Sequence, residues 1–100
     1  MPPRLVVRQA AEADIADAAR WYEARAPGLG SDFLRAVDVA LAEILHMPER
    51  FPEVYPHCRR AHLRRFPYAL YFIATPDRVS IVGCLHARRD PRRWQERVGE

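Results

Sequence analysis

The stretch from residue 68 to residue 86 constrains the fold more than any other part of this chain. Its two runs, 68–74 and 79–86, are rich in aromatic and β-branched side chains, which suit the pleated surface of a sheet. Pro76 and Asp77 lie between the runs and supply the geometry of a tight turn. The pattern predicts a β-hairpin, so every fold open to this chain must contain these two antiparallel strands.

Side chains of the second run should alternate between the two faces of the sheet, because successive residues of a strand point in opposite directions. The expected core face carries Val79, Ile81, Gly83 and Leu85. The opposite face carries Ser80, Val82, Cys84 and His86. This second face is still partly apolar, so it is either a groove that a partner covers or a half-solvated surface.

Shorter patterns predict the remaining strands and a loop. Residues 4–8 and 59–66 are expected to be strands, and Pro67 marks a tight reversal or a sheet edge. Residues 47–58 contain three prolines, which predict a stiff connection on the surface.

Two helices are predicted in the first half, over residues 10–25 and 31–46. Their apolar stripes consist of Ala11, Ile15, Ala18 and Tyr22 in the first helix and of Phe33, Val37, Leu41 and Ile44 in the second. Ser31 is a good N-cap for the second helix, and Trp21 with Tyr22 is expected to pack between helix and sheet. Because the turn between the helices is short, they should form an antiparallel helical hairpin.

A last helix is expected over 91–98, with Asp90 as its N-cap and Pro91 in its first turn. The order β-α-α-β-β-β, followed by this short helix, predicts a single α+β domain over residues 1–100. Its small antiparallel sheet is expected to carry the N-terminal helical hairpin on one face.

Composition is that of a globular protein, with 49% apolar and 29% charged residues. No apolar run approaches the roughly 20 residues that span a bilayer, and the first residues lack the apolar segment of a signal peptide. No membrane contact and a cytoplasmic location are therefore expected. Cys58 and Cys84 are too few for a disulfide framework and should remain thiols.

Charge is divided unevenly along the chain. All sixteen basic residues are arginine, and residues 51–100 carry ten arginines against five acidic residues, whereas residues 1–50 carry six against eight. Four arginines and a tryptophan gather in the tail as Arg88, Arg89, Arg92, Arg93 and Trp94. This tail is expected either to contact an anionic partner or to be a solvated helix start balanced by acidic neighbours.

His57, Cys58 and His62, with Cys84 and His86, could in principle bind zinc. Their spacing matches no compact zinc motif, and a structural zinc site needs four convergent ligands. The sequence also lacks a glycine-rich phosphate loop and a nucleophile elbow. We therefore predict no metal and no cofactor.

The chain resembles the ParE/RelE superfamily of toxins from type II toxin-antitoxin modules. The segments that carry the resemblance are Asp14-Ile15, Trp21-Tyr22, Phe33-Leu34, Met47-Pro48-Glu49-Arg50-Phe51-Pro52, Arg64-Arg65-Phe66-Pro67-Tyr68-Ala69-Leu70-Tyr71-Phe72 and His86-Ala87-Arg88-Arg89-Asp90-Pro91-Arg92-Arg93-Trp94. The family's compact β-α-α-β-β-β fold agrees with the order predicted above.

The resemblance implies one of two activities. RelE-like members are ribosome-dependent mRNA endonucleases, which need cations on the phosphate and groups that exchange protons. ParE-like members poison DNA gyrase and carry out no cleavage of their own. Here Ala69 stands where nuclease relatives commonly place arginine, and Trp94 stands where they often place tyrosine. These differences, together with the absence of lysine, favour the ParE branch.

The resemblance therefore predicts a gyrase-inhibiting toxin that a cognate antitoxin neutralises, with no catalytic residue favoured. The alternative is an mRNA endonuclease that uses His86 with Arg65 and Arg88, acting on the ribosome and mRNA. A third alternative is a non-toxic interaction module of the same fold. The expected partner-binding residues are Arg64, Arg65, Tyr68, Tyr71, His86, Arg88, Arg89, Arg92, Arg93 and Trp94.

Overall fold

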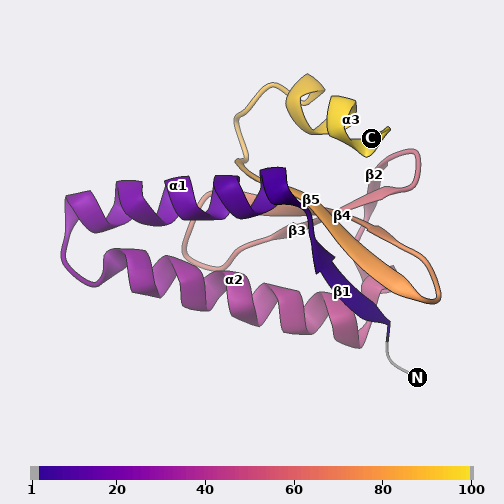
Figure 1. The fold of residues 1–100 in the computed structure, drawn as a ribbon, viewed down its shortest axis with the longest axis horizontal. Coiled ribbons are helices and arrows are strands. Elements are labelled where there is room, and N and C mark those ends of the chain that lie inside the picture. The colour runs from indigo at the N-terminus through magenta and orange to yellow at the C-terminus, as the bar shows by residue number, and fades with distance from the viewer. Residues whose placement is uncertain (1–2, 100) are drawn as a thin grey trace.

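A five-stranded sheet carries a helical hairpin on one face and a short helix on the other (Figure 1). The structure is a computed structural model that describes residues 3–99. In chain order its elements are β1 (Arg4–Val7), α1 (Gln9–Arg25), α2 (Leu29–His46), the 3-10 helix η1 (Pro48–Arg50), β2 (Glu53–Tyr55), β3 (Cys58–His62), β4 (Tyr68–Ala74), β5 (Arg78–His86) and α3 (Arg92–Val98). The predicted α+β fold and its element order are thereby confirmed.

The strands lie in the order β1-β5-β4-β3-β2. The chain from β2 to β5 forms an antiparallel meander, with the predicted hairpin of β4 and β5 at the centre of the sheet. The sheet is mixed rather than purely antiparallel, because β1 pairs with β5 in the parallel direction. Parallel pairing is open to β1 because the long connection through both helices returns the chain to the sheet.

Two segments of the sheet differ from the predictions. The segment expected to be a loop over 47–58 contains η1 and the short edge strand β2, which pairs with β3. The strand expected over 59–66 ends at His62, and a bend that includes Arg65 at φ +72° follows it. A residue with positive φ interrupts the pleat, so the reversal begins before Pro67.

The turn between the helices is built around glycine and a carboxylate. Gly28 has φ +89°, a left-handed conformation that glycine adopts without steric cost. The Glu23 carboxylate at the end of α1 accepts hydrogen bonds from the Gly28 N–H (3.0 Å) and the Gly30 N–H (3.0 Å). It thus satisfies backbone groups at the start of α2 that Ser31 was expected to satisfy. That prediction was wrong because α2 begins two residues earlier, at Leu29.

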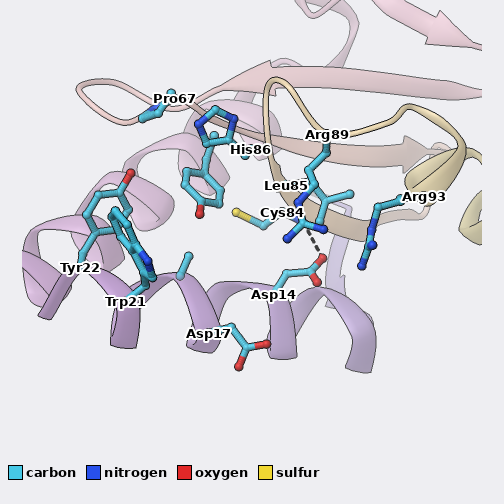
Figure 2. Close-up of a pocket in the computed structure, with 12 residues that line it drawn as sticks. Asp14, Asp17, Trp21, Tyr22, Pro67, Cys84, Leu85, His86, Arg89 and Arg93 are labelled. Atoms are coloured by element: carbon cyan, nitrogen blue, oxygen red, sulfur yellow. Dashed lines mark hydrogen bonds between the residues drawn. The ribbon is translucent and has the colours of Figure 1, made fainter. Parts of the chain in front are cut away.

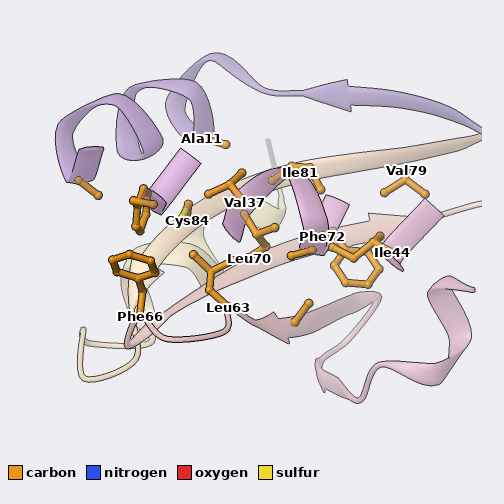
Figure 3. Close-up of a cluster of buried hydrophobic side chains, with 14 residues drawn as sticks. Ala11, Val37, Ile44, Leu63, Phe66, Leu70, Phe72, Val79, Ile81 and Cys84 are labelled. Atoms are coloured by element: carbon orange, nitrogen blue, oxygen red, sulfur yellow. The ribbon is translucent and has the colours of Figure 1, made fainter. Parts of the chain in front are cut away.

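The main core lies between the sheet and the helical hairpin (Figure 3). Its largest fully buried side chains are Phe33, Phe72, Ile44, Leu70, Ile81 and Val79. Phe33 and Ile44 come from the predicted stripe of α2, while Leu70 and Phe72 alternate along β4. Helical spacing on one layer and strand spacing on the other therefore converge on the same apolar volume.

A bulge in β5 reverses the predicted faces of its second half. Tyr71 pairs with Gly83 and Phe72 with Ile81, so Val82 is one extra residue on β5. An extra residue shifts the alternation by one place. As a result Cys84 joins the main core and Leu85 points to the other face, opposite to the prediction, whereas Val79 and Ile81 lie as predicted.

A second core fills the other face of the sheet. Trp94 of α3 stacks on Tyr71 of β4, with ring centroids 4.5 Å apart and an interplanar angle of 14°. Cys58, Ala69, Val82 and Leu85 complete this cluster. The face that was expected to be open or half-solvated is therefore covered here by the protein's own C-terminal helix. α3 begins at Arg92, so Pro91 and not Asp90 is at the N-cap, although Asp90 still accepts a hydrogen bond from the Arg92 N–H (3.0 Å).

Candidate functional site

A groove of about 610 Å³ lies between α1 and the open end of the β4–β5 hairpin, where β4 begins and β5 ends (Figure 2). One wall is α1, and the other is formed by the end of β5 and the segment that follows it. The lining residues are Asp14, Asp17, Ala18, Trp21, Tyr22, Pro67, Tyr68, Cys84, Leu85, His86, Arg89 and Arg93. In Figure 2 the aromatic side chains of α1 gather at one end and Arg89 and Arg93 lie above Asp14 at the other.

The aromatic end is a set of rings in edge-to-face contact. The ring centroid of Tyr22 lies 5.1 Å from that of Trp21 and 6.0 Å from that of Tyr68. The ring centroids of Tyr68 and His86 are 5.4 Å apart. Trp21 is 51% exposed, and the Arg25 guanidinium covers part of its ring at 4.2 Å. The expectation that Trp21 packs between helix and sheet was wrong, because about half of the residue is exposed beside the groove.

The two tyrosine hydroxyls of this end are neutral hydrogen-bond donors. Burial raises the pKa of Tyr22, and the neighbouring Tyr68 adds to the shift. Burial is also the main cause that raises the pKa of Tyr68. Both hydroxyls therefore stay protonated near neutral pH, and a ligand could accept a hydrogen bond from either.

His86 is held in one tautomer by the backbone. Its Nδ1 accepts a hydrogen bond from the Arg88 N–H (3.1 Å), so in the neutral ring the proton is on Nε2. The Nε2–H can donate to a carboxylate or phosphate. This arrangement leaves the Nε2–H of His86 as the group that a bound anion would contact.

An ion pair closes the other end of the groove. The Arg97 guanidinium donates to the Asp14 carboxylate at 2.5 Å, and both side chains are mostly buried. Asp14 also accepts from the Cys84 N–H (3.0 Å), and Arg97 donates to the Val82 carbonyl (3.3 Å). These are backbone groups that β1 cannot reach, because β1 ends at Val7 opposite Ile81. The ion pair therefore provides the hydrogen bonds that a longer β1 would otherwise make to this edge of β5.

Gly83 makes this arrangement possible by lying close to the ion pair. A side chain at this position would bring its Cβ to 2.9 Å from Nη1 of Arg97. A larger residue would require the Arg97 guanidinium, at the end of a flexible side chain, to shift away from the sheet edge.

Basic groups on the second wall are available to a ligand. Within residues 3–99, the guanidinium groups of Arg88, Arg89 and Arg93 form no ion pair, whereas Arg92 is paired with Asp90 at 2.7 Å. On the α1 wall, Asp14 is neutralised by Arg97 and Asp17 forms an ion pair with Arg20. The groove therefore presents net positive charge at its basic wall, above a largely apolar floor.

The structure brings together only part of the predicted site. Tyr68, His86, Arg89 and Arg93 all line the groove, and Arg88 lies exposed on the same segment. Arg64 and Arg65 lie elsewhere, beside α2, where Arg64 pairs with Glu43 at 2.8 Å and Arg65 lies 3.8 Å from Asp32. The nuclease alternative needs Arg65 near His86, but Arg65 does not line the groove.

Tyr71 and Trp94, two further residues of the predicted site, are only 4% and 5% exposed. Both lie in the second core, stacked on each other. In this conformation they hold α3 on the sheet and have almost no surface to offer a partner.

Sequence reasoning missed the contribution of α1 to the site. Asp14, Asp17 and Trp21 recur at i, i+3 and i+7, which places them on one side of the helix. This stripe runs beside the apolar stripe, and it was the available signal. Nothing in the sequence shows that the stripe faces the segment after β5, since that depends on how α1 lies on the sheet.

The groove offers binding groups and no activated nucleophile. Burial, reinforced by the nearby Asp14 charge, raises the pKa of the Cys84 thiol to about 12, so this sulfur stays protonated. Within residues 3–99, no three side chains of His, Cys, Asp or Glu come together as metal ligands. No helix in the described part of the chain is long and apolar enough to cross a bilayer.

Fold and groove together define a small single-sheet α+β protein with an open groove that has one basic wall. Residues 5–91 match the family described as the ParE toxin of the type II toxin-antitoxin system parDE. The chain belongs to this family, which confirms the resemblance noted from the sequence.

A solved structure titled as the chromosomal ParDE toxin-antitoxin system from P. aeruginosa has the same fold, with a TM-score of 0.74. The match covers 84% of this chain and 95% of the other at 16% identity, so it is evidence for the fold alone. No curated protein matches the sequence.

Proposed function

We propose that this ParE-family toxin poisons DNA gyrase, and that a cognate antitoxin neutralises it by placing a segment in the groove. The match to the ParE toxin family over residues 5–91 carries the proposal. The groove supports it, because its donors and aromatic rings suit a peptide that carries both carboxylates and apolar side chains.

The chemistry of the groove favours a poison over a nuclease. RNA cleavage would need a proton acceptor beside cations on the phosphate. Nδ1 of His86 is engaged by the Arg88 N–H, Ala69 provides no cation, and Trp94 is buried on the other side of the sheet. The mRNA endonuclease therefore remains the alternative outcome of the test.

The target is tested by two assays run in parallel. Purified toxin is incubated with gyrase and supercoiled DNA, and separately with programmed ribosomes. Gyrase-dependent DNA breaks with intact mRNA are the expected result. Cleaved mRNA with unaffected gyrase would overturn the proposal and favour the nuclease. Inactivity in both assays, with folding verified by circular dichroism, would favour the non-toxic interaction module.

Antitoxin docking in the groove is tested by charge reversal. Arg89→Glu and Arg93→Glu should each weaken antitoxin binding by about tenfold or more, because each places a negative charge where an antitoxin carboxylate is expected. Arg78→Glu is a matched control, since Arg78 is exposed at the far end of β5. Titration calorimetry at two salt concentrations measures the effect.

The control variant should bind as the unaltered chain does. If Arg89→Glu and Arg93→Glu also bind unchanged, the antitoxin uses another surface. The surface beside α2 that includes Arg64 and Arg65 would then be the next candidate, and Arg64→Glu and Arg65→Glu would test it in the same way.

A further inference from the structure

The outer side of α2, away from α1, is a partly exposed helix face bordered by Arg64 and Arg65. In Figure 1 α2 forms the lower margin of the ribbon, with α1 on its other side. Val39, at the middle of this face, is 46% exposed, although it is a large apolar residue. A shallow depression of about 170 Å³ beside it is lined partly by Ala36 and Phe66. The face therefore combines exposed apolar surface with small residues that allow another chain to approach closely.

The residues of this face are arranged symmetrically around Val39. Arg35 precedes Val39 by four residues, and Glu43 follows it by four. Ala36 and Ala42 lie three residues to either side. Spacings of three and four residues keep all of these positions on one side of the helix.

The symmetry extends one further turn in each direction. Asp32 lies seven residues before Val39, and His46 lies seven residues after it. The stretch from Asp32 to His46 is about 21 Å long at 1.5 Å per residue. Each charged or polar residue on one half of the face thus has a complementary residue at the mirrored position on the other half.

We infer that this face binds a second copy of the same chain, with the two α2 helices antiparallel around a two-fold axis at Val39. An antiparallel pair centred on Val39 places Arg35 of each copy opposite Glu43 of the other. It also places Ala36 opposite Ala42, and Asp32 opposite His46. A two-fold interface must be self-complementary in this way, because one surface patch supplies both sides.

Existing ion pairs on the face are compatible with this arrangement. Within the chain, Asp32 pairs with Arg35 and lies 3.8 Å from Arg65, and Glu43 pairs with Arg64. These side chains are partly exposed, so a second copy would extend two local pairs into a network across the axis rather than replace a buried bond. Because one helix face is a small interface, the dimer should be weak and concentration-dependent.

The surface is distinct from the groove, which lies on the α1 side and shares no lining residue with it. Self-association therefore does not depend on the proposed function. The two copies would keep their grooves open.

Mixing two charge variants tests the inference. In a dimer of Arg35→Glu, the new glutamate of each copy would lie opposite Glu43 of the other copy. In a dimer of Glu43→Arg, the new arginine of each copy would lie opposite Arg35 of the other copy. Each variant alone should associate at least tenfold more weakly than the unaltered chain. A mixture should form the heterodimer, since both of its contacts then join a glutamate to an arginine. Sedimentation equilibrium and native mass spectrometry distinguish the species.

A thiol on the proposed axis gives an independent test. Two copies of the Val39→Cys variant should form a disulfide between their residues 39 under mild oxidation, because the axis brings these two residues together. Cys58 and Cys84 are 0% and 1% exposed, so they do not compete. Ala13→Cys on the exposed side of α1 is the control and should not cross-link at the same rate.

Three results would overturn the inference. They are a monomer at all concentrations, equal cross-linking at positions 39 and 13, or equal association of the charge variants alone and mixed. Binding of an antitoxin that is weakened by Arg35→Glu, in a chain that stays monomeric, would assign the face to the antitoxin instead.

Discussion

Glu23 shows how a single side chain can start one helix from the end of another. Its carboxylate accepts hydrogen bonds from the N–H groups of Gly28 and Gly30. Gly30 also allows the close approach of the helices, since a Cβ there would lie 2.7 Å from the Ala19 carbonyl oxygen. The negative charge lies at the N-terminus of α2, where the helix dipole favours it.

Replacing Glu23 with alanine should lower the free energy of unfolding by about 1 kcal/mol, a usual value for the loss of an N-cap. Glu23→Gln should cost less, because the amide oxygen can still accept. Asp38→Ala, in the exposed middle of α2, is the control. Urea unfolding followed by circular dichroism measures all three. Equal stability of Glu23→Ala and Asp38→Ala would contradict the capping role.

The sequence pointed to Ser31 instead of Glu23 because capping rules search within three residues of the helix start. Glu23 lies five residues before Gly28 and reaches it only because the chain turns back on itself. A residue whose role depends on such a turn cannot be found by local spacing.

At the scale of elements, α3 and the bulge in β5 depend on each other. The bulge turns Leu85 toward α3 and Cys84 toward the helical hairpin, so both cores gain an apolar side chain. Strict alternation could not predict this exchange. Gly83 was the available signal, since an isolated glycine in a strand often marks a bulge.

Trp94→Ala should lower the free energy of unfolding by about 3 kcal/mol, because it empties the centre of the second core. Trp94→Phe should cost less than half of that, since a ring still stacks on Tyr71. Denaturant unfolding monitored by near-UV circular dichroism measures the change. An unaffected stability in Trp94→Ala would show that Trp94 serves a partner rather than the core, as the sequence suggested.

At the scale of the whole molecule, the sequence predicted the layers well because periodicity, turns and element order all act locally. It predicted the groove poorly, because the groove joins α1, the end of β5 and the segment before α3. Asp14 and Arg97, separated by 83 residues, meet only in the folded chain. Charge segregation pointed to the arginines of the tail, of which Arg89 and Arg93 line the groove, and it gave no sign that Asp14 and Asp17 lie opposite them.

Because the chain has no lysine, fewer groups contribute to the change in its folding stability at alkaline pH. Burial raises the pKa of Cys58 to about 11, and burial with the Asp14 charge raises that of Cys84 to about 12. Because folding raises both values above those of the unfolded chain, their stabilising contribution is complete below about pH 8 and is lost as pH rises through 9 to 12.

Stability measured by urea unfolding should therefore fall between pH 9 and pH 11. The double variant Cys58→Ala/Cys84→Ala should be less stable at pH 7, because it leaves cavities, but its stability should fall less steeply over this range. Parallel slopes for the two chains would contradict the assignment to the thiols and leave the buried tyrosines as the source.

The ion pair between Asp14 and Arg97 also has a consequence for the order of folding. Closing a loop of 83 residues costs more chain entropy than forming the helical hairpin or the β4–β5 turn. The local elements should therefore assemble first, and α3 should dock last. Until it does, the Val82 carbonyl and the Cys84 N–H form an open sheet edge, and the nascent toxin is vulnerable to strand pairing with other chains.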